Sequence, residues 1–169
     1  AVYLEEYFNN SILPILSPQV ISKKNPFPFL KNKEIYAVAL LGSKNNDKIG
    51  VVPCSNGVFD RLIPIPSDSH KYMLIEELIL HFLPKIFKKY SVKSKSLIRI
   101  IRNADIDMDE AFYDEEMDYR DTMEQLIKER RKLCPVKLDY SRVLDVIVIS
   151  ALCKELIVDK KQVFSSVSP

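Results

Sequence analysis

Runs of apolar residues separated by polar stretches divide the first half of this chain into short predicted strands. Two apolar segments, 34–41 and 48–53, are separated by a polar stretch and predict a β-hairpin. The segment 59–66 predicts a third, edge-like strand, because Pro64 and Pro66 cannot donate hydrogen bonds to a neighbouring strand.

Apolar residues recur every three or four positions elsewhere and predict amphipathic helices. The helical segments are 3–13, 75–87, 114–131 and 142–156. Pro14 ends the first helix. In the second segment, Pro84 is expected to end the regular helix near Phe82. Ser141 is expected to cap the last helix at its N-terminus.

Strand-like patterns return at 92–102, 135–140 and 163–164, and the first of these predicts the central strand. Asp159 and Gln162 have the spacing of a capping box for a single helical turn before the last strand. Paired strands and separate helices together predict an α+β fold, in which helices pack on an antiparallel or mixed sheet.

The predicted organisation is one domain preceded by a connector. A chain of 169 residues is long enough to bury a substantial core. Residues 1–17 are interpreted as a connector helix from a preceding N-terminal domain, and residues 18–169 as the domain itself. The chain begins at Ala1, without a Met or a signal-peptide pattern, which indicates a fragment of a longer protein.

Charge changes sign at the end of the central strand. No Asp or Glu lies between Leu78 and Ala104, where seven Lys and Arg residues lie, whereas the segment that begins at Asp105 is acidic. The formal net charge of +2 does not indicate nucleic acid as a partner, and no basic block is interleaved with stacking aromatic residues. The basic zone between Leu78 and Ala104 is therefore more informative about function than the net charge of the chain.

Strand alternation sorts the basic residues of the central strand onto two faces. Lys93, Lys95 and Arg99 share one face and are candidates for contact with an anionic ligand or a partner chain. Arg102 has the opposite parity and is expected to form a structural pair with Asp105.

Several functional classes find no support in the residue pattern. The three cysteines are widely spaced and form no CxxC motif, which indicates reduced thiols in a cytoplasmic protein. No apolar run is long enough to span a membrane, so membrane insertion is not expected. With three glycines, the chain has no glycine-rich phosphate-binding loop.

Candidate metal and catalytic residues are equally sparse. The acidic segment 105–116 has the oxygen-ligand spacing of an EF-hand, but Glu110 stands where that loop needs glycine, so no metal site is predicted. His70 and His81 have no metal-ligand partner at the usual spacing. On residue chemistry alone, the chain is a non-catalytic interaction or scaffolding domain.

Two aromatic rings stand on a stiff backbone beside two prolines. Each residue before a proline is held extended, so Phe27 and Phe29 are presented from an extended segment. These rings either fill the edge of the core or contact a ligand, and the sequence leaves both possibilities open.

Several short motifs occur in the order in which they occur in the middle, or head, domain of polyphosphate kinase, and the chain resembles that family over essentially its whole length. The motifs are ILPILSP at 12–18, NPFPFLKNK at 25–33, RLIPIP at 61–66, IEELILHF at 75–82 and IRNADIDMDE at 101–110, with DKKQVFSSVSP at the end. The chain departs from the family pattern at Ser17, where a threonine is usual, and at 165–168, where a glycine typically precedes the proline.

The resemblance implies that the parent protein is a phosphotransferase. Such an enzyme reversibly transfers the terminal phosphate of ATP to polyphosphate through a phosphohistidine, with ATP and Mg²⁺ bound by flanking N-terminal and C-terminal catalytic domains. The head domain itself has no catalytic residues and no cofactor, and an isolated fragment is expected to be inactive. The parent is expected to be a cytoplasmic homo-oligomer, with peripheral membrane association left open.

For this chain, the resemblance implies a role in shaping the polyphosphate path and the dimer. Lys93, Lys95 and Arg99 are the candidate residues for the path or for the interface, because a polyanion needs distributed positive charge. A solvated basic face without a ligand fits the same residues. The alternative function is a free-standing α+β module that binds anionic ligands such as phosphoinositides.

Overall fold

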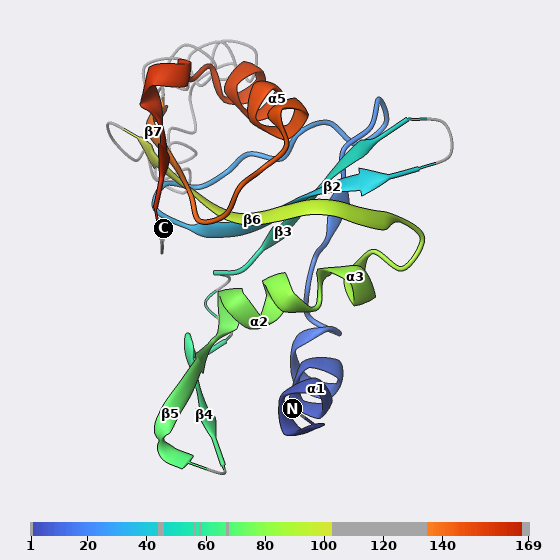
Figure 1. Cartoon of the computed structure of the whole chain (residues 1–169), viewed down its shortest axis with the longest axis vertical. Coiled ribbons are helices and arrows are strands. Elements are labelled where there is room, and N and C mark those ends of the chain that lie inside the picture. Colours follow the sequence, from blue (N-terminus) through green and yellow to red (C-terminus); the bar gives the residue numbers. More distant parts are fainter. Residues whose placement is uncertain are drawn as a thin grey trace, which may run out of the picture.

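Strand β6 (Ser91–Arg102) crosses the middle of the fold, as its apolar pattern predicts (Figure 1). The chain is seen in a computed structural model that describes residues 2–43, 46–55, 57, 59–66, 68–102 and 135–166. Its main sheet has six strands in the order β1-β3-β2-β6-β7-β8. The other strands are β1 (Gln19–Val20), β2 (Ile35–Gly42), β3 (Lys48–Pro53), β7 (Pro135–Tyr140) and β8 (Val163–Ser165).

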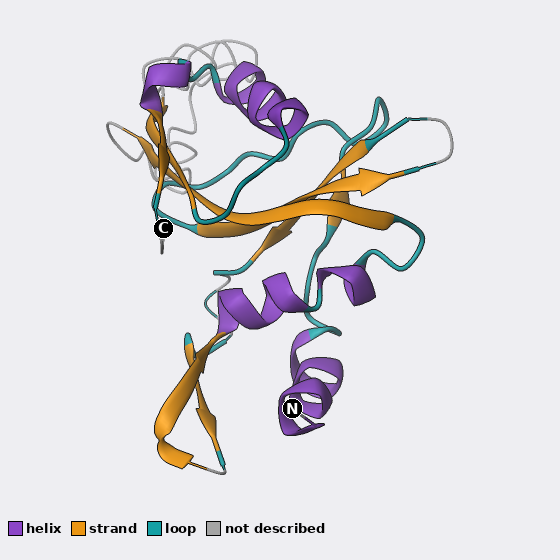
Figure 2. Cartoon of the chain, in the orientation of Figure 1, coloured by secondary structure: helices purple, strands orange, loops and turns teal. Residues whose placement is uncertain are grey.

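The sheet is mixed, and helices cover both of its faces. Its neighbouring strands are antiparallel except for β7 and β8, which are parallel. One face carries α1 (Val2–Tyr7), α2 (Ile75–His81) and α3 (Leu83–Ile86), and the other carries α5 (Val146–Leu156) (Figures 1 and 2). The predicted α+β class is therefore confirmed.

Strand β2 is apolar along its length because it is buried on both faces. Ala37 and Ala39 point to a core beneath α2, whereas Val38 and Leu40 point to a core beneath α5. We call these the α2-side core and the α5-side core. The α2-side core includes Phe8, Ile12, Leu83 and Leu97, and the α5-side core includes Leu30, Ile98, Ile100, Leu138, Val148 and Leu152.

The N-terminal helix belongs to the α2-side core. Helix α1 continues into a π-helical segment, Phe8–Ile12, in which Leu13 N donates to Phe8 O at 2.8 Å. Phe8 and Ile12 are fully buried, and the Phe8 ring stacks on Phe82 with centroids 4.6 Å apart. Pro14 follows this segment, as expected for a residue that cannot continue a helix.

The proline-rich third strand leaves the main sheet. Strand β4 (Leu62–Ile65) pairs only with β5 (Asp68–Leu74), in a separate two-stranded sheet that projects from the body beside α1 (Figure 1). The predicted edge-like strand is therefore present over Leu62–Ile65, in a sheet of its own. Pro64 and Pro66 remove donors that another strand would need, and Ile63 anchors the hairpin in the α2-side core.

Two helix boundaries that the sequence predicted can be compared with the structure, the end of α2 and the start of α5. The predicted break near Phe82 is confirmed, since α2 ends at His81 and α3 begins at Leu83. The predicted cap at Ser141 was wrong. Helix α5 begins at Val146, and the Asp145 side chain accepts a hydrogen bond from Ile147 N at 2.9 Å.

Ser141 instead lies directly after β7 and is hydrogen-bonded to β6. Its hydroxyl accepts from Leu97 N at 3.2 Å, and its own N–H donates to the hydroxyl of Ser96 at 3.1 Å. Farther on, the capping box of Asp159 and Gln162 is confirmed at the start of the short 3₁₀ turn Lys160–Gln162. The predicted helix 114–131 and the acidic segment 105–116 lie outside the described residues.

Candidate functional site

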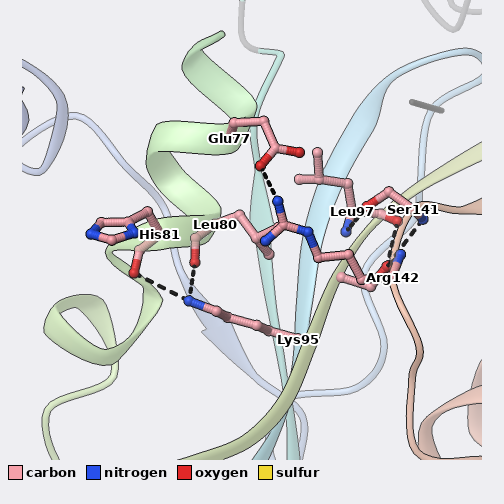
Figure 3. Close-up of polar contacts among 8 residues, drawn as sticks. Glu77, Leu80, His81, Lys95, Leu97, Ser141 and Arg142 are labelled. Carbon is pink, nitrogen blue, oxygen red and sulfur yellow. Dashed lines mark hydrogen bonds and ion pairs between the residues drawn. The ribbon is translucent and has the colours of Figure 1, made fainter. Parts of the chain in front are cut away.

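Lys95 ties the central strand to the end of α2. Its Nζ donates to Leu80 O at 2.8 Å and to His81 O at 3.2 Å, so the side chain reaches across the sheet surface to the last carbonyls of the helix (Figure 3). The C-terminal carbonyls of a helix lack partners within the helix and carry partial negative charge. Lys95 therefore makes structural contacts with its charged group.

Burial lowers the pKa of Lys95, and the nearby charge of Arg142 lowers it further. Arg142 lies in the same network, where its Nη2 donates to Glu77 Oε2 at 2.5 Å (Figure 3). Its backbone N–H donates to the buried hydroxyl of Ser96 at 2.9 Å. This network joins α2 and the loop after β7 to the same stretch of β6.

Lys93 lies at an irregularity near the start of β6. Leu40 pairs with Ser94 and Leu41 with Val92, so Lys93 is the extra residue of a bulge. Val92 packs against the α2-side core there. The sequence placed Lys93 on the same face as Lys95 and Arg99 by strict alternation, and the bulge interrupts that alternation. The Lys93 Nζ makes two 2.8 Å contacts with the carboxylate of Asp47.

Arg99 shares a buried carboxylate with a lysine that the sequence pattern did not single out. Arg99 Nη2 lies 3.4 Å from Asp139 Oδ2, and Lys137 Nζ lies 2.8 Å from Asp139 Oδ1. Asp139 is 1% exposed, whereas the side chains of Arg99 and Lys137 are 34% and 39% exposed. Alternating polar residues in 135–140 signal a common face for Lys137 and Asp139, but only the strand register places Arg99 opposite Asp139.

Arg102 lies on the other side of the strand, next to the proline-rich segment. Its Nη2 and Nε donate to Leu30 O at 3.1 and 3.3 Å, and its guanidinium lies 4.7 Å from the centre of the Phe29 ring. Its backbone N–H donates to Asn32 Oδ1 at 2.9 Å. The predicted partner Asp105 lies outside the described residues.

The two rings of the proline-rich segment 25–29, Phe27 and Phe29, have different environments. Phe27 packs against the α5-side core, whereas Phe29 is 55% exposed and lines a groove of about 530 Å³ with Pro28, Tyr36 and Pro53. The first ring fills the edge of the core, and the second is accessible.

Tyr36 forms part of the wall of this groove and is itself buried. Its hydroxyl accepts from Lys31 N at 2.9 Å and donates to Glu34 Oε2 at 3.2 Å. Burial raises the pKa of Tyr36 from 10.0 to about 12. The folded state therefore favours the neutral phenol.

A pH dependence follows for Tyr36. Because its pKa is higher in the folded chain, its stabilising contribution is present below pH 10 and is lost as the pH rises toward 12. We expect Tyr36→Phe to lose roughly 2 kcal/mol less stability than the wild type between about pH 9 and about pH 12. Urea unfolding of both proteins at each pH measures this, and equal losses would contradict it.

In the part of the chain that is described, no three His, Cys, Asp or Glu side chains are grouped to hold a metal ion. The His81 ring packs edge-on against Phe82, with centroids 4.8 Å apart. In the same residues, no helix is long and apolar enough to cross a membrane.

Comparison with known proteins decides the family. The family described as polyphosphate kinase middle domain matches residues 1–169. The chain belongs to this family. Polyphosphate kinases of Bacillus cereus and Halalkalibacterium halodurans are 32% and 31% identical to it, over 96% and 99% of this chain. These alignments cover 24% of each relative, so the chain spans about a quarter of the length of these polyphosphate kinases.

The fold agrees with this assignment. The crystal structure of polyphosphate kinase from Porphyromonas gingivalis matches 99% of this chain and 23% of its own chain, with a TM-score of 0.73 and 18% sequence identity. The six-stranded sheet with helices on both faces is therefore the fold of a polyphosphate kinase segment.

Proposed function

We propose that this chain is the non-catalytic middle domain of an enzyme that reversibly transfers the terminal phosphate of ATP to polyphosphate. The observation that carries the proposal is the match of the middle-domain family to residues 1–169, together with the names of relatives about four times as long. In this proposal the phosphohistidine, ATP and Mg²⁺ belong to flanking domains. The parent acts as a cytoplasmic homo-oligomer.

Within the parent, we assign the basic side chains of β6 to two tasks. Lys93 and Arg99 keep charged groups partly exposed, at 52% and 34%, and contribute to the polyphosphate path or to a subunit interface. Lys95 supports them by fixing β6 to α2 through two carbonyl oxygens. Arg102 braces the other side of the strand through Leu30 and Phe29.

The isolated chain is expected to show no polyphosphate kinase activity. The described residues offer no grouped metal ligands, and the sequence has no glycine-rich loop to hold a nucleotide phosphate. The measurement is ATP-dependent formation of acid-insoluble polyphosphate by the purified chain, beside a blank and the full-length parent. Synthesis by the isolated chain above the blank would contradict a non-catalytic role, and an inactive full-length parent would contradict the proposed reaction.

A further inference from the structure

Two cations and one buried carboxylate form a compact group on β6 and β7. We propose that Arg99 and Lys137 bind phosphate groups of a polyphosphate chain as a pair, and that Asp139 is the positioning residue that holds both cations. The inference rests on the proposed function and adds two residues, Lys137 and Asp139, to it. It is carried by the two ion pairs, at 3.4 Å for Arg99 and 2.8 Å for Lys137.

Strand register brings the three side chains to one face of the sheet. Arg99 on β6 lies opposite Asp139 on β7. Lys137, two residues before Asp139 on β7, lies opposite Ile101 on β6. Leu138 points into the α5-side core, so Asp139 and Lys137 lie on the opposite face. Both cations therefore meet the same carboxylate from adjacent strands.

Burial separates the roles of the three groups. Asp139 is 1% exposed and is fixed within the sheet, whereas the side chains of Arg99 and Lys137 are 34% and 39% exposed. A ligand can therefore reach the cations but not the acid. The Lys137 Nζ also lies 5.3 Å from the centre of the Phe164 ring, within the range of a cation–π contact.

The charge of the group selects an anionic ligand. One carboxylate cannot neutralise two cations, so the group of Arg99, Lys137 and Asp139 keeps a net positive charge. A guanidinium and an ammonium are the side chains that proteins use to bind phosphate oxygens. A polyphosphate chain presents many equivalent phosphates to one such pair, which raises their local concentration.

The test is binding of linear polyphosphate to the 169-residue chain, measured by fluorescence anisotropy over a series of salt concentrations. Arg99→Gln and Lys137→Gln are each expected to weaken binding by about 3- to 10-fold. Each is also expected to reduce the slope of log affinity against log salt by roughly one. Unchanged affinity and slope in both variants would overturn the proposal.

Lys85 provides a matched control. It is 38% exposed, forms an ion pair with Glu5, and its Nζ lies 5.1 Å from the centre of the Phe82 ring, so it matches Lys137 in exposure and in having one acidic and one aromatic neighbour. Lys85→Gln makes the same change in charge and is expected to leave the affinity within about 2-fold of the wild type. Equal weakening by Lys85→Gln and Lys137→Gln would show that general positive charge binds the polyanion, and the assigned pair would be wrong.

Asp139→Asn separates positioning from simple charge. The variant gains positive charge, so electrostatics alone predicts tighter binding. An amide has a single oxygen and can hold only one of the two cations, so we expect binding at least about 3-fold weaker, with a folded chain by thermal melting. Tighter or unchanged binding would overturn the positioning role. If this variant does not fold, the two Gln variants and the Lys85 control decide the assignment.

A second binding experiment, with vesicles that contain phosphoinositide, distinguishes a polyphosphate ligand from a lipid headgroup. Binding of polyphosphate but not of vesicles supports both the pair and the proposed function. Binding of vesicles alone, lost in Arg99→Gln and Lys137→Gln, would overturn the proposed function while leaving the pair as a phosphate site. Polyphosphate binding that is unchanged in Arg99→Gln and Lys137→Gln would overturn this inference and would not contradict the proposed function.

Discussion

Replacing Phe8 with Ala is expected to lower the free energy of unfolding by about 3 to 5 kcal/mol. Phe8 is fully buried in the α2-side core, and its ring stacks on Phe82 with centroids 4.6 Å apart. Removing it deletes apolar contacts and leaves a cavity between the N-terminal segment and α2. Chemical denaturation followed by circular dichroism measures the change.

The matched control for this prediction is Ile15→Ala in the same segment. Ile15 is 47% exposed, so its truncation is expected to change the free energy of unfolding by less than about 1 kcal/mol. The pair also tests the assignment of residues 1–17 to a separate connector. If that segment were independent of the domain, Phe8→Ala would leave the main unfolding transition unchanged, which would contradict the role of Phe8 in the core.

Replacing Leu152 with Ala is expected to lower the free energy of unfolding by about 2 to 5 kcal/mol, because the residue fills the α5-side core. Leu152 is 1% exposed and lies in the cluster that also contains Ile98 and Leu138. The truncation loosens the attachment of α5 to the sheet. Urea denaturation measures the loss as a lower midpoint at an unchanged slope.

Ile147 supplies the comparison on the same helix. It is 57% exposed, and Ile147→Ala is expected to have an effect below about 1 kcal/mol. Similar losses for Leu152→Ala and Ile147→Ala would mean that α5 presents a different face to the sheet from the one described.

The sequence predicted helix boundaries correctly where the boundary depends on residues close by in the chain. The break at Phe82 follows from Pro84, and the capping box of Asp159 and Gln162 needs only residues three apart. The error at Ser141 has the opposite origin. A serine before an apolar stripe is a good cap by local criteria, but Ser141 is held by Leu97 and Ser96 on another strand.

The candidate site shows the same division. The sequence singled out Lys95 and Arg99 as cations on the central strand, and the structure gives both of them partners. It did not single out Asp139 or Lys137. An Asp in a short strand is usually solvated, and only its pairing with a residue 40 positions away shows that it is buried between two cations.

The sequence by itself determined the family resemblance, the α+β class and the strand that carries the basic residues, because apolar periodicity and residue order are local properties. The tertiary structure decided which segments share a core and which charges meet. Phe8 joins the α2-side core, β4 leaves the main sheet, and Asp139 meets Arg99. These outcomes depend on strand register and on burial between distant segments, which no local pattern specifies.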